Sequence, residues 1–216
     1  CEKWFAPIPS RPRVIRSLDV EPKQKEARRL EVEREVPNDA IFIAFHMCDR
    51  RSKEYHATDL LSDILSNGPS SRLFRKLVKE EAVFSELDAY ITGDDDAGLF
   101  IFNGKPAEGI SLEKAEQAIW IEIDRMKEVL VEDDELEKVK NKTESATIFS
   151  EVSVLNKAMS LAHFENMNDA EDINKEVKKY REVTSQQLQD LARSIFRKEN
   201  SNTLIYKARK EQDVIK

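Results

Sequence analysis

The sequence predicts an α+β fold, in which helices pack on one face of a mostly antiparallel sheet. Strand-like hydrophobic patterns occupy much of the first half of the chain, and one more ends it. All five glycines lie between Gly68 and Gly109, and the 3.6-residue periodicity that follows contains no glycine or proline. A length of 216 residues suffices for one large domain or two small ones.

The first 22 residues are expected to form an extended arm. Four of the seven prolines lie there, and each fixes φ and removes a backbone N–H donor. Trp4, Phe5 and Ile8 are too apolar for a free linker. We therefore expect the arm to lie against a packed surface of its own domain or of a preceding one.

Two strands should follow the arm. Residues 30–36 alternate apolar and charged side chains, which predicts a half-exposed strand. Pro37-Asn38-Asp39 supplies a turn. Residues 40–47 form a continuous apolar run, which predicts a central strand buried on both faces.

A helix pair and a hairpin come next. Residues 55–67 and 71–80 carry apolar side chains at helical spacing, and Gly68-Pro69 ends the first helix. Residues 84–92 and 99–103 then predict a β-hairpin around an Asp-rich bend.

Four helices and one strand are expected after Gly109. The first begins at Ser111 and reaches about Leu130. The second begins at Asp133 or Asp134 and places a long apolar series toward the core: Leu136, Val139, Ile148, Phe149, Val152, Leu155 and Met159. The others cover about 169–180 and 184–197, and residues 202–206 form the last strand.

Charge argues against nucleic acid as a partner. The net charge is −7, while the first 30 residues carry +4, so the rest of the chain is strongly acidic. No apolar run is long enough to span a bilayer, so no membrane role is expected either. We expect a soluble protein, and the sequence does not decide between cytoplasm and periplasm.

No catalytic constellation is apparent in the sequence. It contains no nucleophile elbow, P-loop or GxGxxG, and neither H-E-x-x-H nor H-x-x-E-H surrounds any of its three histidines. His46, Cys48 and His56, with Asp49, could suggest metal ligands, but their spacing matches no standard zinc pattern. We therefore predict no catalytic residue, metal ligand or cofactor in this chain, and substrate-binding residues stay unassigned.

Residues 65–77 resemble the helix-turn-helix of the M16 metallopeptidases, the family of pitrilysin, insulin-degrading enzyme and mitochondrial processing peptidase. The matching residues, expected to have a structural role, are Gly68, Ser71, Arg72, Leu73 and Phe74. Similarity extends to further segments: Lys3–Pro9, Glu21–Gln24, Glu135–Lys140 and Val183–Gln189.

The resemblance implies one half of a two-half peptidase with the M16 or LuxS-like metallohydrolase fold. Residues 1–29 would be an interdomain linker and the tail of a preceding domain, and residues 30–210 the C-terminal-type domain. Zinc would be bound by the partner half, whose H-x-x-E-H glutamate acts as general base. The expected partners are that zinc-bearing half and peptide substrates, and a homodimer is also an option.

The sequence departs from the family at one functional pair. Members often supply an Arg and a Tyr, seven residues apart, that hold the scissile carbonyl. Here Val78 and Ser85 stand at those positions. The first reading is therefore a non-catalytic half that forms the chamber wall and peptide platform. The alternative is a pseudo-peptidase that serves as a scaffold or binding subunit.

Overall fold

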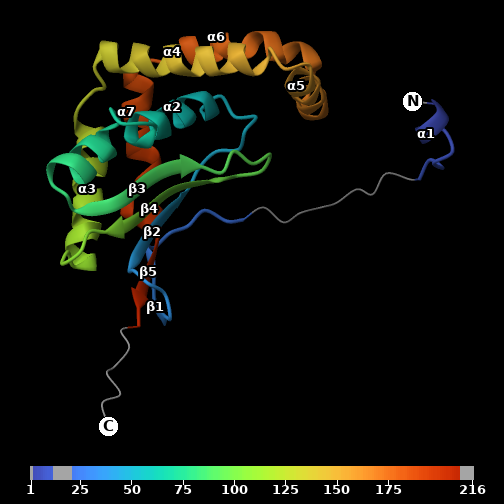
Figure 1. Cartoon of the computed structure of the whole chain (residues 1–216). Coiled ribbons are helices and arrows are strands. Elements are labelled where there is room, and N and C mark those ends of the chain that lie inside the picture. Colours follow the sequence, from blue (N-terminus) through green and yellow to red (C-terminus); the bar gives the residue numbers. More distant parts are fainter. Residues whose placement is uncertain (1, 12–20, 210–216) are drawn as a thin grey trace.

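The computed structural model describes residues 2–11 and 21–209 (Figure 1). Its elements in chain order are α1 (Glu2–Phe5), β1 (Arg28–Arg34), β2 (Ala40–His46), α2 (Tyr55–Ser66), the π-helix η1 (Phe74–Glu80), β3 (Phe84–Ile91), β4 (Leu99–Pro106), α3 (Leu112–Glu128), α4 (Asp133–Ser150), α5 (Val154–Met167), the 3₁₀-helix η2 (Ala170–Lys175), α6 (Glu176–Arg181), α7 (Ser185–Ile195), the 3₁₀-helix η3 (Lys198–Asn200) and β5 (Ser201–Ala208). No helix among these residues is long and apolar enough to cross a bilayer.

A five-stranded sheet with strand order β1-β5-β2-β4-β3 forms the base of the molecule. The pairs β2–β4, β2–β5 and β3–β4 are antiparallel, and only β1–β5 is parallel. The last strand, β5, therefore lies between β1 and β2, the first two strands of the chain. The predicted α+β class and the mostly antiparallel sheet are confirmed.

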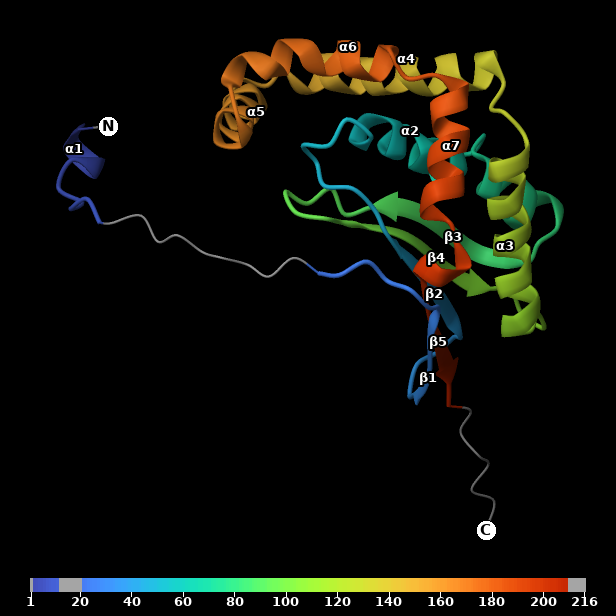
Figure 2. The same ribbon diagram turned by 180° about the vertical axis from the view of Figure 1, so that it is seen from behind.

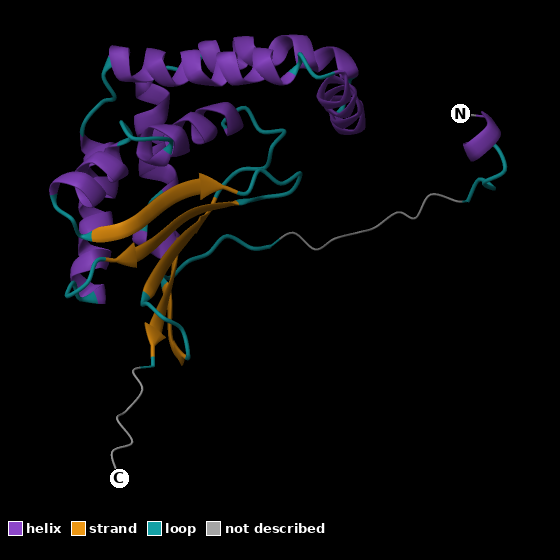
Figure 3. Cartoon of the chain, in the orientation of Figure 1, coloured by secondary structure: helices purple, strands orange, loops and turns teal. Residues whose placement is uncertain are grey.

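Helices cover one face of this sheet (Figures 1 and 3). Seen from behind, α3 and α7 stand in front of the strands (Figure 2). α2 lies between β3 and the layer formed by α4 and α6. α4 and α6 pack side by side and contact α2 from above. No helix of the described residues lies on the other face of the sheet.

Aromatic side chains lie at the centre of the core between the sheet and α7. The Phe196 ring lies 5.2 Å from that of Phe45 and 4.9 Å from that of Phe100, both in edge-to-face geometry. All three side chains are fully buried. Such pairs add about 0.5–1.5 kcal/mol beyond area burial, so these contacts hold α7 against β2 and β4.

The prediction that residues 40–47 are buried on both faces is wrong. Ile41, Ile43 and Phe45 are fully buried, whereas Phe42 and His46 on the opposite side are only half-buried. The reason is that helices cover a single face of the sheet. A continuous apolar run does not reveal by itself how many faces a strand has covered.

The long helix predicted from residue 133 is two helices. α4 ends at Ser150, and α5 starts after Ser153, whose hydroxyl accepts a hydrogen bond from the Asn156 N–H at 3.3 Å. Leu136 and Val139 are buried as expected. The rest of the predicted core series is exposed: Ile148, Phe149, Val152, Leu155 and Met159. The segment extends beyond the helices that cover the sheet, so nothing in the described residues covers it.

Smaller differences concern the remaining helices. Residues 170–181 form a 3₁₀-helix followed by an α-helix instead of one helix. α7 begins as predicted, with Thr184 and Gln187 forming a complete capping box. In place of an extended start to the arm, Glu2–Phe5 form one helical turn, closed by Ala6 N–H to Glu2 O at 3.2 Å before the first proline. The middle of the arm lies outside the described residues.

Candidate functional site

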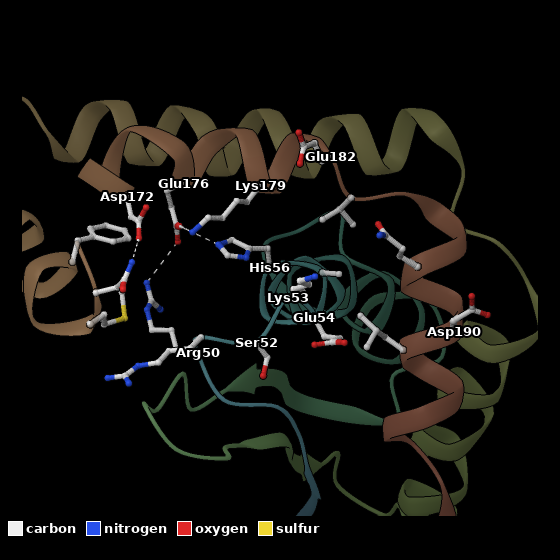
Figure 4. A pocket seen from close by; sticks show the side chains of 18 of the residues that line it. Arg50, Ser52, Lys53, Glu54, His56, Asp172, Glu176, Lys179, Glu182 and Asp190 are labelled. Carbon is white, nitrogen blue, oxygen red and sulfur yellow. Dashed lines mark hydrogen bonds and ion pairs between the residues drawn. The ribbon is translucent and has the colours of Figure 1, made fainter. Parts of the chain in front are cut away.

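A cavity of about 1120 Å³ lies between the start of α2, the α5–η2–α6 segment and α7 (Figure 4). Its wall is mixed. Arg50, His56 and Lys179 line it together with acidic residues, and Phe164 and Leu191 supply apolar surface. Its volume is slightly above the roughly 300–1,000 Å³ that is typical of small-molecule sites, so its charged groups need a close account.

Glu176 is the centre of the charged groups in this cavity. Its Oε2 lies 3.1 Å from His56 Nε2 and 3.3 Å from Lys179 Nζ, and its Oε1 lies 3.9 Å from Arg50 Nη2 (Figure 4). The His56 contact is not aligned as a hydrogen bond. Burial favours a higher pKa for the Glu176 carboxyl, but His56 and Lys179 outweigh it and lower the pKa. Glu176 is thus held as a carboxylate.

Asp59 and Tyr180 form a second buried pair, which also joins α2 to α6. The Tyr180 hydroxyl donates to Asp59 Oδ2 at 2.6 Å, and burial raises the pKa of Asp59, with the Tyr180 hydrogen bond opposing. Burial next to Asp59 also raises the pKa of Tyr180. These groups join α2 to α6. The sequence reasoning missed them because Asp59 and Tyr180 are 121 residues apart.

This cluster acts as a structural clamp between α2 and α6. Its charges already pair with one another, and no serine, threonine or cysteine is within hydrogen-bond reach of the His56–Glu176 pair among the interactions of the described residues. Among the described residues, Arg50 and Lys179 lie near the Glu176 carboxylate, and the rings of Tyr55 and Tyr180 pack against His56. Arg50 Nη1 also donates to the Tyr55 hydroxyl at 2.7 Å. The arrangement therefore fixes helices in place.

The metal-ligand set considered from the sequence does not come together. His46 Nε2 lies 3.6 Å from Glu21 Oε1, and Cys48 Sγ contacts Thr58 Oγ1 at 3.9 Å, while His56 pairs with Glu176. Burial raises the pKa of the Cys48 thiol, which disfavours a thiolate ligand. Within residues 2–11 and 21–209, no group of three or more His, Cys, Asp or Glu side chains could hold a metal ion.

The residues of the 65–77 motif form a joint between helices. Gly68 has φ of 100°, a conformation that glycine adopts at little cost, and its carbonyl accepts from the Ser71 hydroxyl at 2.7 Å. Arg72 forms a bidentate pair with Glu135 of α4, at 3.0 Å from Nε and 2.6 Å from Nη2. Leu73 is fully buried, and Lys79 lies over the Phe74 ring.

Val78 and Ser85 flank an irregular part of the backbone. Val78 lies in the π-helix η1 and packs against the core, and Ser85 occupies a β-bulge where its hydroxyl donates to Lys105 O at 3.1 Å. Neither side chain provides an Arg or Tyr function.

The uncovered face of the sheet is a second candidate surface. Strand register places Leu30, Leu204 and Phe42 in one row across β1, β5 and β2. A neighbouring row includes Ile101 and Tyr90, on β4 and β3. Leu30 is 60% and Tyr90 44% exposed. This face offers a mildly apolar surface whose side chains are exposed or half-buried.

Residues 1–143 match the family model described as the peptidase M16 inactive domain. The match covers about two thirds of the chain and includes the 65–77 motif. The chain belongs to the M16 inactive-domain family. The M16 resemblance predicted from the sequence is thereby confirmed.

Solved structures share the fold. A protease from Helicobacter pylori has a TM-score of 0.88 at 22% identity, over 95% of this chain and 51% of that one. The inactive peptidase domain of a protein assigned as a zinc protease, from Bordetella parapertussis, has a TM-score of 0.73 at 19% identity, over 84% of this chain and 98% of that one. A chain of complex III from Candida albicans has a TM-score of 0.69 at 13% identity, over 82% of this chain and 45% of that one.

The M16 inactive domain described here thus spans about half the length of the Helicobacter protease chain and nearly the full length of the Bordetella domain. Comparison with curated proteins gives no match. The residues of this domain do not fit the zinc site associated with M16 peptidases, because no suitable ligand group exists in the part that the structure describes.

Proposed function

We propose that this domain is the non-catalytic half of an M16-like zinc metallopeptidase. It forms the wall of a chamber and the platform for an unfolded peptide, opposite a half that binds zinc. Residues 1–29 serve as the linker and the tail of the preceding half, and residues 30–210 form the platform domain. Zinc and the catalytic base reside in the partner half.

The uncovered sheet face carries this proposal. Among the described residues, no helix covers this side of the five-stranded sheet, and one row across it combines apolar groups such as Leu30 and Leu204 with hydrogen-bonding groups such as Asn103. An extended peptide needs an apolar surface with spaced polar partners. The cavity beside Glu176 fits this role less well because its charges are already paired.

Substitutions on this face test the platform role in the complete two-half enzyme. Leu30→Lys and Tyr90→Ala should each raise KM for a peptide substrate by about 5–10-fold with little change in kcat, because they remove binding shared by ground and transition states. Peptide-cleavage kinetics measure both constants. Ile121→Lys is the matched control, since Ile121 is an exposed apolar residue on α3, in the helical layer. Unchanged KM in both variants would contradict the platform role.

A scaffold function is the second candidate. Val78 and Ser85 occupy the positions of the carbonyl-binding pair, and a chain of complex III from Candida albicans shares the fold. Elemental analysis and peptide cleavage on the complete protein separate the two candidates. Zinc and cleavage are expected for the peptidase, and neither for the scaffold. The isolated 216-residue chain should hold no stoichiometric zinc in either case.

A further inference from the structure

The end of α4 and the start of α5 form an apolar corner that none of the described residues covers. Its large side chains are Ile148, Phe149, Val152, Val154, Leu155 and Met159, and their exposed fractions range from 56% to 85%. Contiguous exposed apolar patches of this kind mark interaction surfaces in soluble proteins. We call these six residues the α4–α5 corner.

α5 buries little of its surface within the described residues. The helix has 14 residues, but Phe164 is its only buried residue. The contacts of α5 with the rest of the domain are chiefly with η2. Figure 1 shows it projecting from the end of the α4–α6 layer. Isolated helices of about 12–15 residues are marginal in water, because most helical stability in proteins comes from packing of an apolar face. An uncovered α5 would therefore fray.

The composition of the corner indicates a permanent interface. The chain is 36% charged, yet only Glu151 and Lys157 are charged between Ser145 and Ala162, and they pair with each other at 3.5 Å. Loss of charge together with Phe, Met and Leu at the surface characterises the centre of an interface. The occupant must likewise present an uncharged apolar surface.

The route of the upstream chain limits what can reach this corner. Gln24 fixes that chain to the sheet, donating from Nε2 to Ser201 O at 2.9 Å and accepting from Asn202 Nδ2 at 2.9 Å. From there the segment before β1 leaves the sheet on the side where α5 projects, in both views (Figures 1 and 2). Fully extended, the chain between Ile8 and Glu21 spans at most about 45 Å.

We propose that the α4–α5 corner is the surface that holds the partner half, and that this half covers Leu155 and Met159. The inference rests on the proposed two-half function. The Helicobacter protease of the same fold has about as much chain again beyond the matched part, which is the length of a second half. A partner tethered near Glu21 lies on the same side of the domain as the α4–α5 corner, and α3 lies on the opposite side.

The test compares amide hydrogen exchange of residues 154–162 in the complete two-half protein and in the 216-residue chain. We expect exchange at least about 10-fold slower in the complete protein, because docking buries the helix. Leu155→Glu combined with Met159→Glu should remove that protection. Lys157→Glu is the matched control, since it changes the charge by the same amount on the same helix and should keep the protection.

Each other outcome overturns the assignment. Equal exchange in the two proteins, or loss of protection in the Lys157→Glu control, would show that no half docks on the corner. If the 216-residue chain alone forms a dimer in sedimentation experiments, and the double variant dissociates it, the occupant is a second copy. Zinc content and peptide cleavage are measured on the same samples. If residues 154–162 are protected from exchange but the protein holds no zinc, only the proposed function is refuted. If the protein holds zinc and cleaves peptides but these residues are not protected, only this inference is refuted.

Discussion

At the scale of single residues, buried charges in this domain join helices. Arg72 and Glu135 connect the 65–77 motif to α4, and their side chains are only 14% and 24% exposed. Glu176 connects α6 to His56 on α2. Breaking a partly buried pair leaves one charge without compensation, which costs more than losing a surface pair.

The Arg72–Glu135 pair should therefore have a measurable effect on stability. We expect Arg72→Ala to lower the free energy of unfolding by about 2–3 kcal/mol, and Arg72→Lys by about 1 kcal/mol, because lysine keeps the charge but loses the bidentate geometry. Urea unfolding measures both. Arg75→Ala is the control and should change the free energy of unfolding by no more than about 0.5 kcal/mol. Arg75 is exposed, and its ion pair with Glu80 is long, at 3.9 Å. Equal effects at both arginines would refute the prediction.

Glu176 should make stability depend on pH. Its pKa in the folded chain is lower than the ordinary value of 4.5. The carboxylate therefore adds stability above about pH 4.5, and this contribution is lost as the pH falls through the folded pKa. Asp59, with its raised pKa, acts in the opposite direction.

The matching variant is Glu176→Gln. It should cost about 1.5–3 kcal/mol at pH 7 and progressively less below pH 4.5, because the neutral amide cannot form charge-assisted contacts with His56 and Lys179. Urea unfolding at pH 7, 5 and 4 follows the difference from the unchanged protein. A difference that stays constant over this range would mean that the carboxylate charge is not the source of the stability.

At the scale of elements, backbone irregularities gather between η1 and β3. A seven-residue π-helix, a β-bulge at Ser85 and a positive φ of 50° at Ala82 follow one another within thirteen residues. An alanine in this conformation is strained because of its Cβ. The sequence pattern of 71–80 predicted a helix but held no signal for its π form.

Ala82→Gly should relieve this strain. We expect a gain of about 0.5–1 kcal/mol in the free energy of unfolding, since glycine adopts positive φ readily, although it also loses more chain entropy on folding. Thermal or urea unfolding measures the gain. Ala107→Gly, at a position without positive φ, should be neutral or destabilising. A loss of stability in the Ala82 variant would mean that the loop is not strained.

At the scale of the whole molecule, two surfaces lack a partner within the described residues. One is the sheet face that carries Leu30 and Tyr90, and the other is the α4–α5 corner. The first is mixed in polarity, as a surface for transient peptide contact would be, and the second is nearly free of charge, as a permanent interface would be. A single domain with both surfaces is understandable as one half of a larger assembly.

The resemblance of residues 65–77 to M16 proteins pointed to the family. The sequence by itself determined the class of fold, most strands and helices, and the helix starts at Ser111 and Thr184. These depend on local chemistry, namely hydrophobic period, turn residues and capping side chains, which act within a few residues. Only the tertiary structure decided that β2 is covered on one face, that the apolar residues from Ile148 to Met159 face outward, and that Glu176 pairs with His56. Each of these depends on which distant segments pack together, and hydrophobic periodicity reports that a face is apolar without reporting what covers it.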